Sequence, residues 1–195
     1  MAESLPQFNL LVSTAADFEE DCFNEVWYHL FALGDEAPVF VRLYIPGLIG
    51  VQSKIDARKF IEYLKQEALK KGLNYFKFIF KVIPIDLIVL TEQEEIITKS
   101  REFLDPNQNV LKEQDTFRIK IVRRFTELKA DDLIRSIAKE VRNKVDLKMP
   151  NWELRVEILR KITGISLLKG DEIFEPKKQS VNEQRPSQLP SASGT

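Results

Sequence analysis

The sequence predicts an α+β fold in two lobes, and two features of the chain support this. Between residues 8 and 90, apolar runs and amphipathic segments follow one another as strand, helix, strand, strand, helix, strand. That order is typical of a split βαβ, ferredoxin-like unit. The second feature is charge: residues 1–110 contain 11 Lys and Arg against 17 Asp and Glu, whereas residues 111–170 contain 15 against 9. An acidic half joined to a basic half predicts a polyanionic partner that only the basic half binds.

Composition excludes several classes of protein. With 44% hydrophobic and 30% charged residues in a chain of 195, there is enough apolar material for one domain or two small ones. No apolar run approaches the roughly 20 residues that a membrane span needs, and the first residues lack the basic region of an export signal. We therefore expect an intracellular, cytoplasmic protein. One cysteine, Cys22, and one histidine, His29, cannot supply a disulfide or a zinc ligand set, so we expect no metal and no cofactor. We predict that Cys22 lies in the core and that His29, at the edge of the same apolar stripe, has a structural role.

The first lobe is predicted element by element from its periodicity. A buried strand covers residues 8–14, and an amphipathic helix runs from Asp17 to Leu33 before Gly34. Two extended runs around Pro46-Gly47 predict a hairpin, and a second helix follows from Asp56 to Lys71. Residues 75–90 are read as further extended chain, bent at Pro84 because proline cannot donate to a sheet. We place the first domain at residues 1–91.

The second lobe, residues 92–175, begins with a predicted short helix that ends before Asp105. A strand follows with Phe117, Ile119 and Ile121 on one face, and a helix is predicted from Asp131 to about Val145. A further strand places Leu154, Val156 and Ile158 on one face, and a last short strand covers residues 164–168. Residues 176–195 contain almost no apolar anchor, which predicts a disordered tail.

Residues 117–159 resemble a THUMP domain, the tRNA-binding module of several RNA-modifying enzymes. The similarity lies in the segments FRIKIVRR and LIRSIAKEV and, above all, in VDLKMPNWELRVEI. The resemblance extends over roughly residues 8–170, because THUMP units follow a ferredoxin-like domain. It implies a ferredoxin-like domain followed by an α/β THUMP domain.

Catalytic motifs of the enzymes that carry THUMP domains do not occur in the sequence. It lacks the Gly-rich loops of methyltransferases and nucleotide-binding enzymes, and one His with one Cys cannot build the zinc site of a deaminase. A THUMP protein of this length resembles the stand-alone type. The resemblance implies a non-catalytic adaptor that binds tRNA and presents it to a separate RNA acetyltransferase, which makes N4-acetylcytidine.

Eight cations of the basic half are the predicted RNA ligands. They would contact phosphate and ribose, and Arg123 or Arg124 would also stack on an unpaired base. The eight are Arg118, Lys120, Arg123, Arg124, Arg135, Lys139, Arg142 and Lys148. Arg135, Lys139 and Arg142 would form one row along the predicted helix.

Three alternatives remain open from the sequence. The chain could be a protein-interaction module of the same fold without RNA binding, or the RNA-binding subunit of a different tRNA modification enzyme. It could also be an enzyme with an unrecognised site, although carboxylates such as Asp146 and Glu157 more simply pair with neighbouring cations. The acidic first half is the expected protein-facing surface, and Trp152 is expected to be a packing residue.

Overall fold

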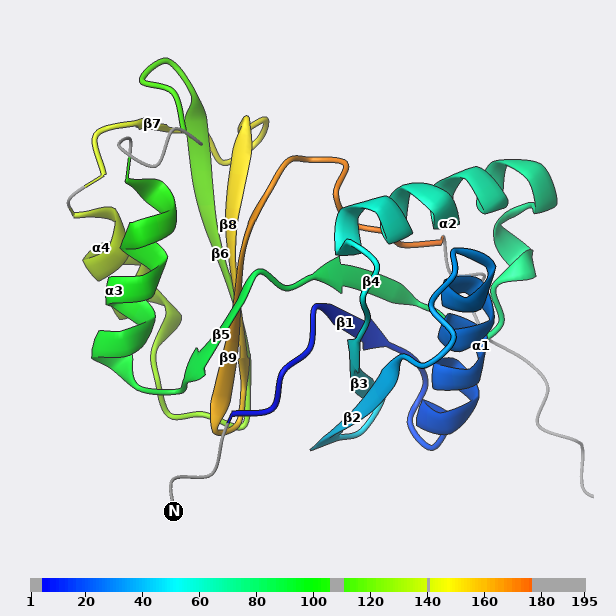
Figure 1. Ribbon diagram of the computed structural model, residues 1–195. Helices are drawn as coiled ribbons and strands as arrows, with labels where there is room; N and C mark the ends of the chain where they lie inside the picture. The colour runs from blue at the N-terminus through cyan, green and yellow to red at the C-terminus, as the bar shows by residue number, and fades with distance from the viewer. Residues whose placement is uncertain (1–4, 106–110, 140, 177–195) are drawn as a thin grey trace, which may run out of the picture.

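The computed structural model describes residues 5–105, 111–139 and 141–176 and consists of two lobes, each a β-sheet covered by helices (Figure 1). The two sheets lie next to each other, and the helices of each lobe lie on the side away from the other lobe. The α+β prediction is confirmed. The predicted tail, residues 176–195, lies outside the described residues except for Pro176.

The first lobe has the ferredoxin-like arrangement. Its elements in chain order are β1 (Leu10–Ser13), α1 (Glu19–Ala32), β2 (Val39–Ile45), β3 (Leu48–Gln52), α2 (Ala57–Lys71), a 3-10 turn (Leu73–Tyr75) and β4 (Lys81–Pro84). The strands are ordered β2-β3-β1-β4, and each neighbouring pair is antiparallel. Leu10 and Val12 of β1 pack under α1 and α2 in one buried cluster that also contains Cys22.

Local sequence signals set the ends of these elements. The Asp56 carboxylate accepts hydrogen bonds from the backbone N–H groups of Arg58 and Lys59 at 3.1 and 2.9 Å, which caps α2. Gly72, with a φ of 84°, ends the same helix. Gly47 in the β2–β3 turn has a φ of 72°, and a Cβ there would lie 2.7 Å from the Thr14 carbonyl oxygen. The hairpin therefore requires glycine at this position.

The second lobe is a mixed sheet with two helices on one face. Its elements are β5 (Leu87–Leu90), α3 (Gln93–Leu104), β6 (Thr116–Arg124), α4 (Ala130–Ala138), β7 (Lys144–Val145), β8 (Trp152–Leu159) and β9 (Ile162–Leu168). The strand order is β5-β9-β8-β6-β7, with β6 parallel to both β7 and β8 and with β9 antiparallel to β5 and β8. The predicted apolar faces of β6 and β8 are confirmed, because Phe117, Ile119, Leu154 and Val156 pack in the cluster beneath α3 and α4.

Two predicted elements differ from the structure. Of the extended chain over residues 75–90, only β4 joins the first sheet, whereas β5 pairs with β9 in the second sheet. The helix predicted to reach Val145 ends at Ala138. Asn143 is buried and donates to the carbonyl oxygens of Lys112 and Asp115 at 2.8 and 3.1 Å, and Val145 pairs with Phe117 in the sheet. These long-range bonds outweigh the helical periodicity of the segment.

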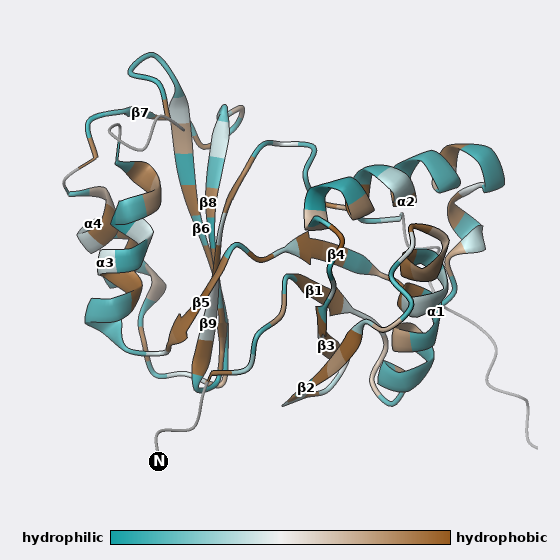
Figure 2. Cartoon of the chain, in the orientation of Figure 1, coloured by the Kyte–Doolittle hydropathy of each residue, from teal (hydrophilic) through white to brown (hydrophobic). Residues whose placement is uncertain are grey.

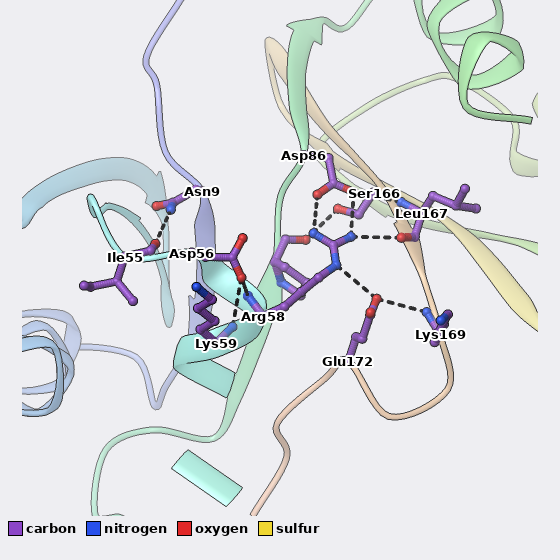
Figure 3. Close-up of polar contacts among 11 residues, drawn as sticks. Asn9, Ile55, Asp56, Arg58, Lys59, Asp86, Ser166, Leu167, Lys169 and Glu172 are labelled. Carbon is purple, nitrogen blue, oxygen red and sulfur yellow. Dashed lines mark hydrogen bonds and ion pairs between the residues drawn. The ribbon is translucent and has the colours of Figure 1, made fainter. Parts of the chain in front are cut away.

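The lobes are joined by apolar and polar contacts. Leu11 and Ile83 of the first sheet pack against Leu159 and Leu168 of the second. Figure 3 shows the polar contact, in which Arg58 of α2 reaches across the boundary. Its terminal nitrogens donate to the Asp86 carboxylate at 2.6 and 2.9 Å, Nη2 also donates to the Leu167 carbonyl at 2.9 Å, and Nε donates to Glu172 at 3.1 Å. Arg58 thus links α2 to β9, to Asp86 between β4 and β5, and to Glu172 in the segment that follows β9.

Candidate nucleic-acid interface

The eight predicted cations occupy two faces of the second lobe instead of one. Along β6 the side chains alternate, so Arg118, Lys120 and Arg124 lie on the face away from the helices. Arg123 lies on the opposite face, the one that α4 covers. The predicted set is therefore divided by the sheet itself.

Arg118 and Arg124 are the two ends of a charged ladder. Arg118 Nε donates to Glu153 at 2.6 Å, and Arg155 Nη1 donates to the other oxygen of Glu153 at 2.9 Å. Arg155 Nε in turn donates to Glu157 at 2.7 Å, and Arg124 Nη1 donates to the second Glu157 oxygen at 2.6 Å. Three cations and two carboxylates thus alternate across β6 and β8, where Figure 2 shows hydrophilic bands on both strands.

The centre of this ladder is buried. Glu157 has no exposed side-chain surface, and Arg155 and Glu153 are also buried. Burial alone would raise the pKa of Glu153, but the hydrogen bonds from Arg155 and Arg118 outweigh it and hold that pKa below its ordinary value. Glu153 therefore remains charged, and the hydrogen bonds of Glu153 and Glu157 hold Arg118 and Arg124 in place. Both arginines are still partly exposed, so each can offer its remaining N–H groups to a phosphate oxygen.

Lys120 adds a further positive charge to this face. It is exposed and lies in register with Arg155 of β8. With Lys120 included, the charged side chains of β6 and β8 on this face are four cations and two carboxylates. This face therefore attracts an anion although its arginines are paired.

On the other face, Arg123 and Arg135 meet at a hollow of about 370 Å³ by the first turn of α4. Lys129 lies at its edge, and Asp131 and Asp132 also line it. Arg135 is 80% exposed on its side chain and lies 3.8 Å from Asp132, an ion pair that contributes little in water. Arg123 Nη1 donates to the Leu128 carbonyl at 2.7 Å, which orients the guanidinium. The backbone N–H groups of the helix start add partial positive charge to the cations.

The remaining three cations lie beyond α4. Lys139 follows its last residue, and Arg142 and Lys148 lie in the connection that leads through β7 to β8. All three are exposed. The predicted row of Arg135, Lys139 and Arg142 along one helix is wrong, because α4 ends before Arg142.

The sequence did not single out Arg155 or Lys129. The alternation of Glu153, Arg155 and Glu157 in the sequence could have indicated a role for Arg155. It places opposite charges on one face of β8, next to the cations of β6. Lys129 carries no such signal, because its role depends on where α4 starts. Among the residues that the structure describes, no group of three or more His, Cys, Asp or Glu side chains could hold a metal ion. Within the same residues, no helix is long and apolar enough to cross a membrane.

Comparison with known proteins identifies the second lobe. Residues 92–168 match the THUMP domain family. The chain contains a THUMP domain. The match ends where β9 ends, and it covers the ladder, the hollow at α4 and all eight predicted cations.

A relative from Drosophila melanogaster, THUMP domain-containing protein 1 homolog, is 30% identical over 118 residues. The aligned region is 57% of this chain and 35% of the relative, so the chain matches about a third of that relative's length. Among solved structures, PH1313 from Pyrococcus horikoshii has a TM-score of 0.56 at 20% identity, over 84% of this chain and 56% of that one. TrmN from Thermus thermophilus has a TM-score of 0.52 at 11% identity, over 81% and 44%. At these identities the structures show a shared fold.

Proposed function

We propose that this protein is a non-catalytic adaptor that binds tRNA through its THUMP domain and presents it to a separate modifying enzyme. One observation carries the proposal: the excess of Lys and Arg over residues 111–170, 15 against 9 Asp and Glu, lies almost wholly within the segment 92–168 that matches the THUMP family. The THUMP domain suggests RNA binding in tRNA modification, and exposed cations on two faces of one small domain suit contacts to a folded phosphate backbone.

The partner enzyme in this proposal is an RNA acetyltransferase that forms N4-acetylcytidine. The support for it is the resemblance to stand-alone THUMP proteins, together with the similarity to the Drosophila relative. The first lobe provides the surface for the enzyme, because its excess of carboxylates repels phosphate.

RNA binding is tested by reversing the charge of the three exposed cations Arg135, Lys139 and Arg142 to glutamate. We expect this triple variant to lose most of its retention of tRNA in a gel shift, whereas a matched triple variant of exposed first-lobe lysines keeps it. The matched lysines are Lys54, Lys59 and Lys77. Unchanged tRNA retention in the first variant would favour a protein-interaction module instead.

The adaptor role is tested by incubating tRNA and acetyl-CoA with this protein, with the acetyltransferase, and with both. The adaptor predicts that N4-acetylcytidine accumulates fastest when both proteins are present, and that none forms with this protein alone. Acetylation by this protein alone would make it the enzyme. A rate that does not depend on its presence would remove the adaptor role.

A further inference from the structure

Three bulky residues with left-handed backbone conformations meet between the lobes. Tyr44, Phe125 and Arg160 have φ values of 55°, 55° and 63°, and they are three of the four non-glycine residues with positive φ in the described part of the chain. Arg160 Nη1 donates to the Tyr44 carbonyl at 3.0 Å, and the Arg160 guanidinium carbon lies 5.3 Å from the centre of the Phe125 ring. We refer to these three residues as the aromatic-arginine cluster.

Chain geometry accounts for two of these conformations, because Arg160 is the first residue of the two-residue β8–β9 turn and Tyr44 lies where the β2–β3 register shifts. A left-handed backbone is unfavourable for a large side chain and persists only where the surrounding structure imposes it, often at ligand-binding sites. Burial does not compensate here, since Tyr44 is 74% exposed and Phe125 is 68% exposed. Two exposed aromatic residues thus lie beside the guanidinium of Arg160.

A hollow of about 580 Å³ lies beside the cluster, within the size range of small-molecule pockets. Its apolar lining includes Leu43, Leu159 and Ile162, and its cations are Arg42, Arg160 and Lys161. Arg42 shares its charge with Glu20 in an exposed pair at 3.2 Å, whereas Arg160 and Lys161 are exposed in the β8–β9 turn. In Figure 1 this turn and the β2–β3 tip lie at the same end of the molecule.

We infer that the aromatic-arginine cluster and this hollow bind an unpaired nucleotide of RNA. Exposed aromatic rings and arginine planes are the groups on which proteins stack single-stranded bases, and the apolar lining suits the face of a base. Arg160 and Lys161 supply charge for the adjoining phosphate. The inference rests on the proposed RNA binding and adds a second contact to it. Phe125 follows two residues after Arg123, which lines the hollow at α4.

The test replaces both rings by asparagine, in the double variant Tyr44→Asn/Phe125→Asn. Asparagine tolerates the left-handed conformation and removes the aromatic surface, so the backbone is retained. The control is Tyr28→Ala, which removes an exposed tyrosine from α1. Two RNA probes, an oligouridine of about ten nucleotides and a blunt-ended hairpin, are titrated by fluorescence anisotropy. Thermal unfolding of each variant checks that it is folded.

We expect the double variant to bind oligouridine at least about tenfold more weakly than the wild type and to bind the hairpin within about twofold of it. The control variant should match the wild type with both probes. Unchanged affinity for oligouridine would overturn the inference and leave the cluster as a contact for protein. An equal loss with both probes would also overturn it, because the site would then not distinguish unpaired RNA.

The two proposals fail in different ways in this assay. Charge reversal at Arg135, Lys139 and Arg142 should weaken binding of the hairpin, whereas the ring substitutions should not. If charge reversal alone leaves binding unchanged, the proposed phosphate interface is contradicted. If the ring substitutions alone leave oligouridine binding unchanged, the nucleotide site is contradicted.

Discussion

The ladder on β6 and β8 predicts a large loss of stability when its central carboxylate is removed. Glu157 has no exposed side-chain surface, and it accepts hydrogen bonds from Arg155 at 2.7 Å and from Arg124 at 2.6 Å. Glu157→Gln removes the charge but keeps the shape of the side chain, so it leaves Arg155 buried with only Glu153 as its counter-charge. Breaking one partner of a buried pair typically costs about 3–5 kcal/mol. We expect a loss of about 3 kcal/mol in the free energy of unfolding.

Urea unfolding at neutral pH measures this loss, provided that the dependence on denaturant is the same in both proteins. Glu102→Gln is the matched control, because Glu102 pairs with Lys99 at 3.0 Å on the surface. Such exposed pairs contribute about 0–1 kcal/mol. A double-mutant cycle of Glu157→Gln with Arg124→Gln should give a coupling energy above about 1 kcal/mol. If Glu157→Gln were no more destabilising than the control, the ladder would not stabilise the THUMP domain as argued.

Three further predictions concern the first lobe and its junction. Arg58→Gln breaks the charged hydrogen bonds between the lobes, so it should lower the free energy of unfolding by about 1.5–3 kcal/mol. It should also speed amide hydrogen exchange around Asp86, and unaltered exchange there would refute the role of Arg58. Burial lowers the pKa of His29 below its ordinary value near 6.5. As pH falls, the His29 imidazole is therefore protonated in the unfolded chain before it is protonated in the folded protein. The urea midpoint should then fall as pH drops below about 6.5, and His29→Phe should weaken this pH dependence. Burial raises the pKa of Cys22 to about 12, so iodoacetamide should label this thiol at neutral pH only after the protein unfolds. Rapid labelling of the native protein would contradict the place of Cys22 in the core.

Much of the fold could be predicted because its signals are local. The apolar spacing of α1 and α2, the capping carboxylate of Asp56 and the alternation of Phe117, Ile119 and Ile121 each lie within one segment, and the structure confirms them. The assignment of β5 failed for the opposite reason. Its apolar sequence suits a buried strand in either sheet, and only pairing with β9, more than 70 residues away, decides between them.

The candidate site was less predictable for the same reason. The sequence predicts that Arg118 and Arg124 of β6 contact RNA, but it does not predict that Glu153 and Glu157 of the neighbouring strand pair with them. Parallel pairing of β6 with β8 brings these residues together, and nothing in either strand alone specifies that register. The aromatic-arginine cluster leaves even less trace, because bulky residues in the left-handed region have no sequence signature of their own.

The salt dependence of tRNA binding tests the central claim most directly, since it measures how many phosphates the THUMP domain neutralises. If about five of the predicted cations contact phosphate, the logarithm of the binding constant should fall with the logarithm of salt concentration at a slope of roughly −3.5 to −4.5. The variant reversed at Arg135, Lys139 and Arg142 should have a slope shallower by roughly 2 to 3, and the variant reversed at the three first-lobe lysines should keep the wild-type slope. A wild-type slope near zero, or one that the first variant leaves unchanged, would contradict an RNA interface on the THUMP domain.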